Sequence, residues 1–232
     1  KVAVRQFTRL VCERCERIVA PTQKTKDLLV RYKVGVPIDV APTGVDLARF
    51  YMPSESDRPR LADLKRSLGI DDFKHVILSL GRVAPEKSIV HLFEMVAPYL
   101  RAHKESCFLV VGGGPSLKNL EKLRDTYGLA GQIVFTGEVP WSSVPDYYRI
   151  ADVLVGNSHT ETQGLTFIEA LASGVPLVVR YNACFDGILE DGVSGTLFTD
   201  EKIFESELNR TLNDDAHRKC RIEHGLNAAQ NV

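Results

Sequence analysis

Residues 75–111 read HVILSLGRVAPEKSIVHLFEMVAPYLRAHKESCFLVV, and this stretch decides the fold. Two short runs rich in Val, Leu and Ile, HVILSL and CFLVV, flank a longer stretch whose apolar residues recur at the spacing of a helix. A strand, a helix and a second strand in this order form a βαβ unit, in which the strands are parallel and the crossover is right-handed. The stretch therefore predicts an α/β protein with a parallel sheet.

The same alternation of strands and helices continues to the end of the chain. Further strand-like runs follow, and stretches with a helical pattern separate them. We expect a Rossmann-like, doubly wound parallel sheet with helices on both faces and a ligand at the carboxyl ends of its strands. The further strands are predicted at QIVFT, DVLVG, PLVV and GTLF, and the helices are predicted to begin near Lys87, Ser116, Val144, Leu165 and Phe185, with two more after Glu201.

The chain before His75 is organised differently. Residues 1–42 form little more than one βα unit, which is too small to hold a core of its own. Since the chain also begins with Lys rather than Met, we interpret this segment as the remnant of a preceding N-terminal domain. Residues 43–74 would be an interdomain linker with a connecting helix, and residues 75–232 a ligand-binding domain. The predicted early elements are helices over residues 6–17, 25–32 and 58–68 and strands over residues 17–22 and 38–43.

Composition argues against a nucleic-acid partner and against a membrane-spanning helix. The 232 residues include 29 Lys and Arg against 30 Asp and Glu, so the net charge of -1 provides no field that would attract nucleic acid. No apolar run approaches the roughly 18 residues of a transmembrane helix, and no signal segment opens the chain. We therefore expect a cytoplasmic protein.

The five cysteines predict neither a metal site nor a disulfide framework. Cys12 and Cys15 form a CxxC within RLVCERCERIVA, but no second Cys or His pair lies at zinc-binding spacing. The helical pattern of this stretch instead predicts two neighbours on one helix face. The odd number of cysteines and their scattered positions also argue against disulfide bonds.

The loop GRVAPEK begins at Gly81, follows the strand HVILSL and leads into a helix. Arg82 and Lys87 therefore emerge at the carboxyl end of a strand, where a doubly wound sheet binds its ligand. Two cations beside a helix amino terminus suit a diphosphate, because charged hydrogen bonds and the helix dipole both favour anions. Taken alone, both residues could also be solvated loop charges.

Two further loops reach the same edge of the predicted sheet. GGGP follows CFLVV, and glycines such as Gly113 would let a ligand approach the backbone. This loop matches the dinucleotide fingerprint only in part, because position 117 is Leu where the third Gly would lie. GEVPW follows QIVFT, and main-chain groups around Glu138 and Val139 could pair with a nucleobase edge. Plain connecting turns explain both loops equally well.

The stretch HTETQGLTFIEA is the most specific part of the sequence. A helical pattern begins directly after Gly164, so the N–H groups of Leu165 and Thr166 lie at a helix amino terminus, which can bind an anion. Glu169 falls about one turn into this helix and can face the same cleft as Glu161. Two carboxylates, which accept hydrogen bonds from hydroxyls, on either side of a phosphate site match the layout of a nucleotide sugar. Each carboxylate alone could instead complement the helix dipole or be a solvated loop residue.

These motifs resemble those of the GT-B-fold glycosyltransferases of family 4, the retaining group often called glycosyltransferase group 1. Glu161 and Glu169 are similar to its E-x7-E motif, residues 81–87 to its phosphate-binding loop, and the PTGVD of residues 42–46 to its interdomain segment. The resemblance covers residues 41–212. It implies a hexosyltransferase and the donor-binding, C-terminal half of a GT-B fold.

The resemblance also implies roles for the site residues. Glu161 would hold hydroxyls of the donor sugar, and Glu169 would hold the donor ribose. Arg82 and Lys87 would neutralise the diphosphate leaving group, so these two cations and Glu161 are the expected catalytic residues, with no metal ion and no cofactor. The full set of expected donor-binding residues is Gly81, Arg82, Lys87, Gly113, Glu138, Val139, Glu161, Gly164, Leu165, Thr166 and Glu169.

The leading stretch CERCERIVAPTQKTKDLL is similar to that of bacterial diacylglycerol glucosyltransferases. This similarity implies UDP-glucose as the donor and a membrane lipid as the acceptor, with a saccharide acceptor as the alternative. The acceptor would bind through the missing part of the N-terminal domain, and the full-length protein would contact the inner face of the cell membrane. The chain by itself would bind a nucleotide sugar without turnover.

Two other functions stay open at this point. A UDP-sugar 2-epimerase of GT-B fold binds similar donors, and it would epimerise UDP-N-acetylglucosamine without any acceptor. A non-catalytic nucleotide-sugar-binding module would bind UDP-glucose and transfer nothing.

Overall fold

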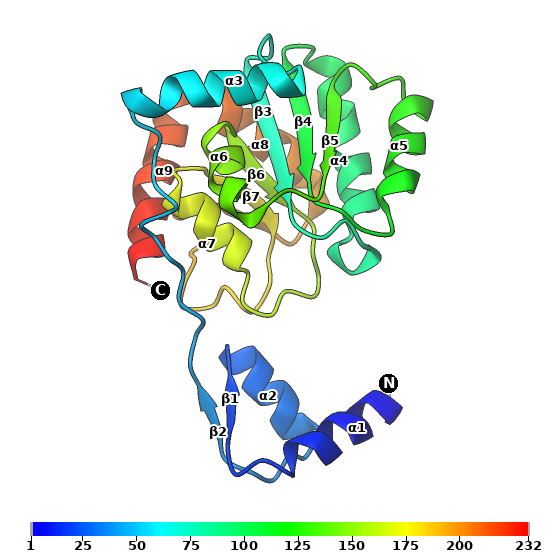
Figure 1. The fold of residues 1–232 in the computed structure, drawn as a ribbon, viewed down its shortest axis with the longest axis vertical. Helices are drawn as coiled ribbons and strands as arrows, with labels where there is room; N and C mark the ends of the chain where they lie inside the picture. The colour runs from blue at the N-terminus through cyan, green and yellow to red at the C-terminus, as the bar shows by residue number, and fades with distance from the viewer. Residues whose placement is uncertain (1, 232) are drawn as a thin grey trace.

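The computed structural model describes residues 2–231 and consists of a small N-terminal unit and a main α/β domain (Figure 1). In the main domain, six parallel strands form one sheet in the order β5-β4-β3-β6-β7-β8. Each predicted strand is present, and its ends agree with the prediction to within one residue. The strands are β3 (His75–Leu80), β4 (Ser106–Val111), β5 (Ile133–Gly137), β6 (Val153–Gly156), β7 (Leu177–Arg180) and β8 (Thr196–Phe198).

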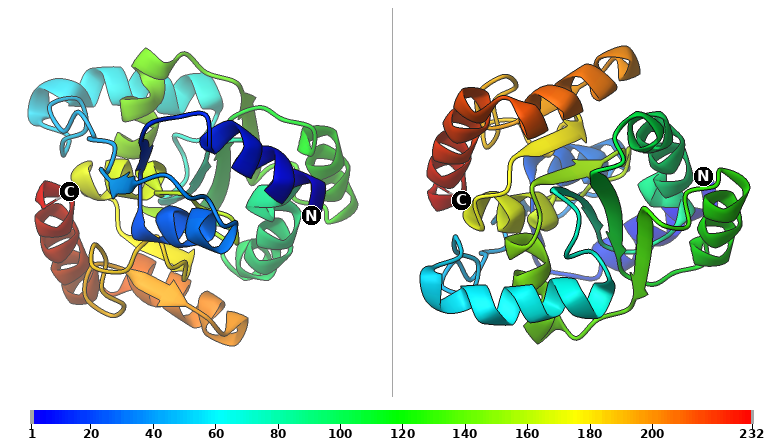
Figure 2. Two further views of the ribbon diagram at one scale, coloured as in Figure 1. Left: turned by 90° about the horizontal axis from the view of Figure 1, so that it is seen from below. Right: turned by 90° about the horizontal axis from the view of Figure 1, so that it is seen from above.

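Helices cover both faces of this sheet, as expected for a doubly wound fold (Figures 1 and 2). One face packs against α4 (Ile89–Ala102), α5 (Leu117–Thr126) and α8 (Phe204–Asn213). The other face packs against α3 (Arg58–Leu68), α6 (Val144–Arg149), α7 (Leu165–Ala172) and α9 (Asp215–Gln230).

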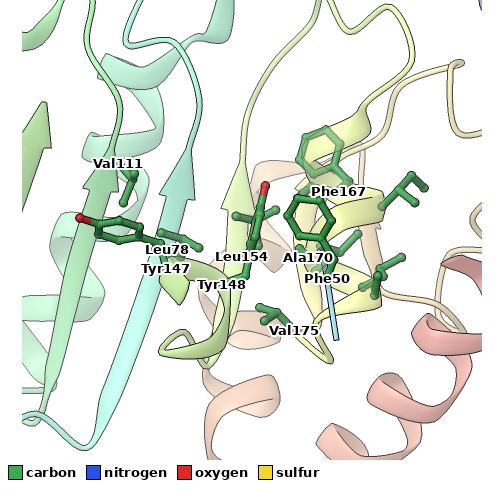
Figure 3. Packing of buried hydrophobic residues seen from close by; sticks show 14 of the residues in the cluster. Phe50, Leu78, Val111, Tyr147, Tyr148, Leu154, Phe167, Ala170 and Val175 are labelled. Atoms are coloured by element: carbon green, nitrogen blue, oxygen red, sulfur yellow. The ribbon is translucent and has the colours of Figure 1, made fainter. Parts of the chain in front are cut away.

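The two faces hold two separate apolar cores, because alternate residues of a strand point to opposite sides of a sheet. In β3, for example, Val76 and Leu78 belong to the core under α6 and α7, while Ile77 belongs to the core under α4 and α8. Figure 3 shows part of the first core, where Tyr148 of α6 lies beside Phe50 with 5.9 Å between the ring centroids. Burial of both faces explains why these strands are continuously apolar rather than alternating.

The strand order reverses next to β3, and this reversal sets the position of the ligand cleft. β3 pairs in parallel with β4 on one side and with β6 on the other. The chain therefore runs outward from β3 to β5, returns to β6, and then runs outward in the opposite direction. Open α/β sheets bind ligands at the carboxyl ends of the strands that flank such a switch point.

The N-terminal unit contains α1 (Val2–Cys12), β1 (Ile18–Ala20), α2 (Gln23–Arg31) and β2 (Ile38–Val40), and β1 pairs in parallel with β2. Its core is small: the buried apolar residues are Ala20, Val34 and Ile38. Figure 1 shows that an extended segment connects this unit to α3 of the main domain. The proposed division of the chain at residues 42 and 74 stays a prediction.

Two of the predicted helices differ from the structure. No helix begins near Phe185, because the buried Phe185 ring packs edge-on against Phe167 and the chain then turns through Gly187, whose φ of 78° is left-handed. The first helix ends at Cys12 instead of residue 17, because the chain must become extended to pair β1 with β2. Cys15 therefore lies beyond the helix, and the prediction that Cys12 and Cys15 share a helix face is wrong.

The glycine loop after β4 packs directly against the loop after β3. Val83 N–H donates to Gly113 O over 2.8 Å, and Gly81 N–H donates to Val111 O over 2.9 Å. A Cβ atom on Gly112 would clash with the carbonyl oxygen of Gly81, and Gly112 has a φ of 132°. The missing side chain therefore allows backbone to approach backbone and so fixes the position of the loop that carries Arg82.

Replacement of Gly112 by Ala should destabilise the fold, because the new methyl group meets a carbonyl oxygen and the residue keeps a φ that L-amino acids avoid. We expect Gly112→Ala to lower the free energy of unfolding by about 2 kcal/mol or more. Urea denaturation followed by circular dichroism measures this change.

Gly131→Ala provides the matched control. A Cβ atom at Gly131 would meet no other atom within 4 Å. The same substitution should therefore change stability by less than about 0.5 kcal/mol at this surface position. Equal stability of the two variants would contradict the packing role of Gly112.

Candidate functional site

Three neighbouring cavities lie at the carboxyl ends of the strands beside the switch point, and their volumes are about 190, 400 and 400 Å³. They adjoin one another, because Lys87 and Glu161 line both the first and the second cavity, and Arg82 lines both the first and the third. Of the predicted residues, the first cavity is lined by Gly81, Arg82, Lys87, Glu161 and Thr166, the second by Lys87, Glu161, Gly164, Leu165 and Thr166, and the third by Gly81, Arg82, Gly113, Glu138 and Val139.

Lys87 and Glu161 form an ion pair in the middle of this site. Lys87 Nζ donates to Glu161 Oε1 over 2.8 Å and to Oε2 over 2.9 Å. The Glu161 side chain is only 9% exposed, and a carboxylate at this depth needs a partner to offset its lost hydration. The sequence predicted that both residues bind ligand but did not predict that they bind each other.

Arg82 lies at the mouth of the site and is held loosely. Its side chain is 67% exposed, and its guanidinium contacts Glu86 over 3.2 Å. An exposed pair of this kind contributes little to stability, so the guanidinium can leave Glu86 at small cost. Arg82 is therefore a cation that a ligand between the first and third cavities can recruit.

The amino terminus of α7 points into the second cavity. Gly164 precedes the helix with a left-handed φ of 75°, and a Cβ atom there would lie 2.8 Å from the Phe185 ring. Only glycine therefore fits this turn without rearrangement. The N–H groups of Leu165 and Thr166 have no partner within the helix, and their dipoles favour an anion in the cavity that both residues line.

Glu169 lies one turn into α7, where it contacts Tyr148 of α6. The hydroxyl group of Tyr148 donates to Glu169 Oε2 over 2.8 Å. Burial raises the pKa of Glu169, and the hydrogen bond from Tyr148 lowers it in part. Glu169 lines none of the three cavities, so it is the one predicted site residue that they do not bring together.

Gly113 and Glu138 meet in the third cavity, on the loops after β4 and β5. A Cβ atom on Gly113 would lie 2.5 Å from Glu138 Cγ, so a larger residue here would displace the exposed Glu138 side chain. Val139 follows Glu138 along the same wall. The roles of these residues toward a ligand stay predictions.

Three further residues of the site were missed in the sequence. Tyr148 supports Glu169, as described above. Asn157 directly follows β6 and lines the first cavity. Its Oδ1 accepts a hydrogen bond from Arg180 Nε over 2.5 Å, and its buried Nδ2 has no hydrogen-bond partner within residues 2–231. Lys24 reaches the Glu161 loop from the N-terminal unit. Of these three residues, only Asn157 could have been found from the sequence, because a polar residue at the end of a buried strand lies at the edge of the sheet where ligands bind.

Two features are absent from the described part of the chain. Among residues 2–231, no three His, Cys, Asp or Glu side chains lie close enough together to hold a metal ion. Over the same residues, no helix has the length and apolar character needed to cross a membrane.

Sequence comparison links the chain to a family of transferases. The family described as "Glycosyl transferases group 1" matches residues 62–227. An alpha-monoglucosyldiacylglycerol synthase of Acholeplasma laidlawii is 38% identical over 184 residues, which are 79% of this chain and 46% of that protein. A second synthase of that name, from Streptococcus pneumoniae, is 35% identical over 79% of this chain and 42% of its own length. The chain thus spans about half the length of these relatives.

Solved structures share the fold. HepE of Anabaena, crystallised with UDP and glucose, superimposes with a TM-score of 0.84 at 19% identity, over 98% of this chain and 62% of that one. The C-terminal domain of a glycosyl transferase group 1 family protein, LpcC of Francisella tularensis, gives a TM-score of 0.70 at 25% identity, over 81% of this chain and 97% of that one.

The buried position of Glu169 predicts a dependence of stability on pH. Because its pKa is higher in the folded than in the unfolded chain, the bound proton stabilises the fold at low pH. This stabilisation is lost as the pH rises through the folded pKa. Glu169→Gln stays neutral and still accepts from Tyr148, so we expect it to be more stable than the wild type at pH 7. Urea denaturation at several pH values should show the difference shrinking toward pH 4.

The control for this prediction is Glu94→Gln on the solvent side of α4. Glu94 is exposed and forms no ion pair within residues 2–231. Its replacement should not produce a pH-dependent gain in stability. If Glu169→Gln shows no pH-dependent gain in stability either, burial does not raise the pKa of Glu169.

Proposed function

Because this chain belongs to the glycosyltransferase group 1 family, we propose that it forms the nucleotide-sugar site of a hexosyltransferase. The observation that carries the proposal is the arrangement around Glu161. A buried carboxylate, a lysine that binds it and the amino terminus of α7 line the same cavity. This arrangement can accept hydrogen bonds from sugar hydroxyls at one point and donate hydrogen bonds to phosphate at the next.

In the proposed reaction, the bond between the anomeric carbon of the sugar and the diphosphate oxygen breaks, and its electron pair stays with the diphosphate. An acceptor hydroxyl oxygen forms the new bond to the anomeric carbon and loses its proton. Arg82, Lys87 and the N–H groups of α7 stabilise the negative charge that develops on the leaving group. These groups supply the positive charge from the protein itself, so we propose that no metal ion or other cofactor takes part.

Lys87 can serve this purpose without releasing Glu161. An ammonium group has three N–H donors, and two of them are directed to the two oxygens of Glu161. The third is available to a phosphate oxygen in the same cavity. In this arrangement Lys87 links the carboxylate that holds the sugar to the phosphate that leaves.

Relatives and neighbours support a more specific version of the proposal. We propose UDP-glucose as the donor and a lipid such as diacylglycerol as the acceptor, with a saccharide acceptor as the alternative and with retention of anomeric configuration. Two relatives at 38% and 35% identity are named alpha-monoglucosyldiacylglycerol synthases, and HepE binds UDP and glucose. The acceptor would bind to the half of these relatives that the chain does not span. A lipid acceptor would bring the full-length protein to the inner face of the cell membrane.

Isothermal titration of the chain with UDP tests the nucleotide site. We expect Glu169→Ala to weaken UDP binding about tenfold, or about 1.4 kcal/mol, because the ribose hydroxyls lose their acceptor. A UDP analogue with a 2′,3′-dideoxyribose lacks these hydroxyls, so Glu169→Ala and the wild type should bind this analogue with equal affinity. Glu94→Ala should behave as wild type with both ligands. Absence of heat from the wild type, or an equal loss with both nucleotides, would contradict this role of Glu169.

A full-length protein containing this chain tests the reaction. We expect it to transfer labelled glucose from UDP-glucose to diacylglycerol or to an oligosaccharide. Transfer should fall at least a hundredfold in Lys87→Met, because the leaving group loses a charged hydrogen bond. Epimerisation of UDP-N-acetylglucosamine without an acceptor would support a 2-epimerase instead. Binding of UDP-glucose without transfer to any acceptor would support a non-catalytic module.

A further inference from the structure

Lys24 connects the N-terminal unit to two loops of the main domain. Its Nζ donates to the backbone oxygen of Glu161 over 2.7 Å and to Asn182 Oδ1 over 2.6 Å. The first loop follows β6 and the second follows β7, so both contacts lie at the ligand edge of the sheet. Figure 1 shows α2, which carries Lys24, next to these loops. The amide oxygen of Asn182 is fixed, because it also accepts from Cys184 N–H over 3.3 Å.

The position of Lys24 in its own helix is unfavourable. Thr22 caps α2 by accepting from Thr25 N–H, so Lys24 lies in the first turn. A cation in the first turn opposes the helix dipole, which favours anions there. Local helix energetics therefore do not explain this lysine. The two hydrogen bonds to the main domain explain why a lysine lies here, because they place its positive charge against a carbonyl oxygen and an amide oxygen.

Neighbouring contacts hold the rest of the same loop. Thr22 Oγ1 donates to Thr162 O over 3.1 Å. The Gln163 side chain pairs with the backbone of Thr43, donating over 2.7 Å and accepting over 3.1 Å. Three successive residues that begin at Glu161 are thus bonded to residues 22–43. Only the contact from Lys24 carries a charge and reaches the peptide of Glu161 itself.

We propose that Lys24 is a positioning residue for the donor sugar. It holds the peptide of Glu161 while Lys87 holds the carboxylate, so the acceptor for the sugar hydroxyls is fixed from both ends. The inference rests on the proposed function, since it assigns Glu161 to the sugar. Uridine and diphosphate would contact Glu169, Arg82, Lys87 and the α7 N–H groups, and Lys24 is hydrogen-bonded to none of them. Lys24 should therefore affect binding of the sugar and not binding of UDP.

The test compares UDP with UDP-glucose by isothermal titration of the chain. We expect Lys24→Met to bind UDP-glucose about tenfold more weakly than the wild type, which corresponds to about 1.4 kcal/mol, and to bind UDP as the wild type does. Lys24→Arg should recover most of the loss, because a guanidinium can donate to both oxygens. Lys26→Met is the matched control: Lys26 lies on the same helix, and within residues 2–231 its side chain makes no hydrogen bond to the main domain.

The outcomes separate this inference from the proposed function. Retained UDP binding by Lys24→Met would show that the main domain is folded. Lys24→Gln is a smaller change, and it should also lose affinity for UDP-glucose while keeping its affinity for UDP. Equal weakening of both ligands would show that Lys24 has only a structural role and would overturn the proposal. Unchanged affinity for UDP-glucose would overturn it as well. A wild type that binds neither ligand would contradict the proposed function itself, and this assignment with it.

Discussion

Parallel pairing of β6 with β3 is the constraint on which the site depends. In the register of this pair, Ile77 lies opposite Val153 and Leu78 opposite Leu154. The two strands therefore end side by side, although 70 residues or more separate them in the chain. Because the strand order reverses here, the loop after β3 and the loop after β6 leave in different directions and form a cleft between them. Lys87 comes from the first loop and Glu161 from the second.

The charges of the site are arranged locally within a chain of almost no net charge. The net charge is -1, yet Lys24, Lys87 and the amino terminus of α7 all adjoin the Glu161 loop. Positive groups that surround a buried carboxylate hold it in one position, and their remaining N–H donors can bind an anion. Of these groups, Lys87 and the amino terminus of α7 also line the cavity in which the proposed diphosphate would lie. Such preorganisation reduces the reorganisation needed when charge develops on a leaving group.

The N-terminal unit contributes more to the site than its size indicates. Its own core is small, and α1 has no buried residue. It makes polar contacts with the loop at Glu161, and these come from residues at the start of α2 and from the segment after β2. A polar interface between two units is typical of parts that move relative to one another, because it buries little apolar surface. The contacts therefore give the unit a means of acting on the site without a large shared core.

The sequence by itself determined the six strands, the parallel sheet, the position at which α7 begins and the loops at the carboxyl ends of the strands. These features depend on patterns within a few residues of each other: apolar runs, helical spacing and glycines at turns. Only the tertiary structure decided that Lys87 binds Glu161, that Tyr148 supports Glu169 and that Lys24 reaches the same loop. It also replaced the helix predicted near Phe185 by turns, because the ring is buried against Phe167. The physical reason is that such contacts join residues far apart in the chain, and their partners are set by strand register and core packing, which local patterns do not encode.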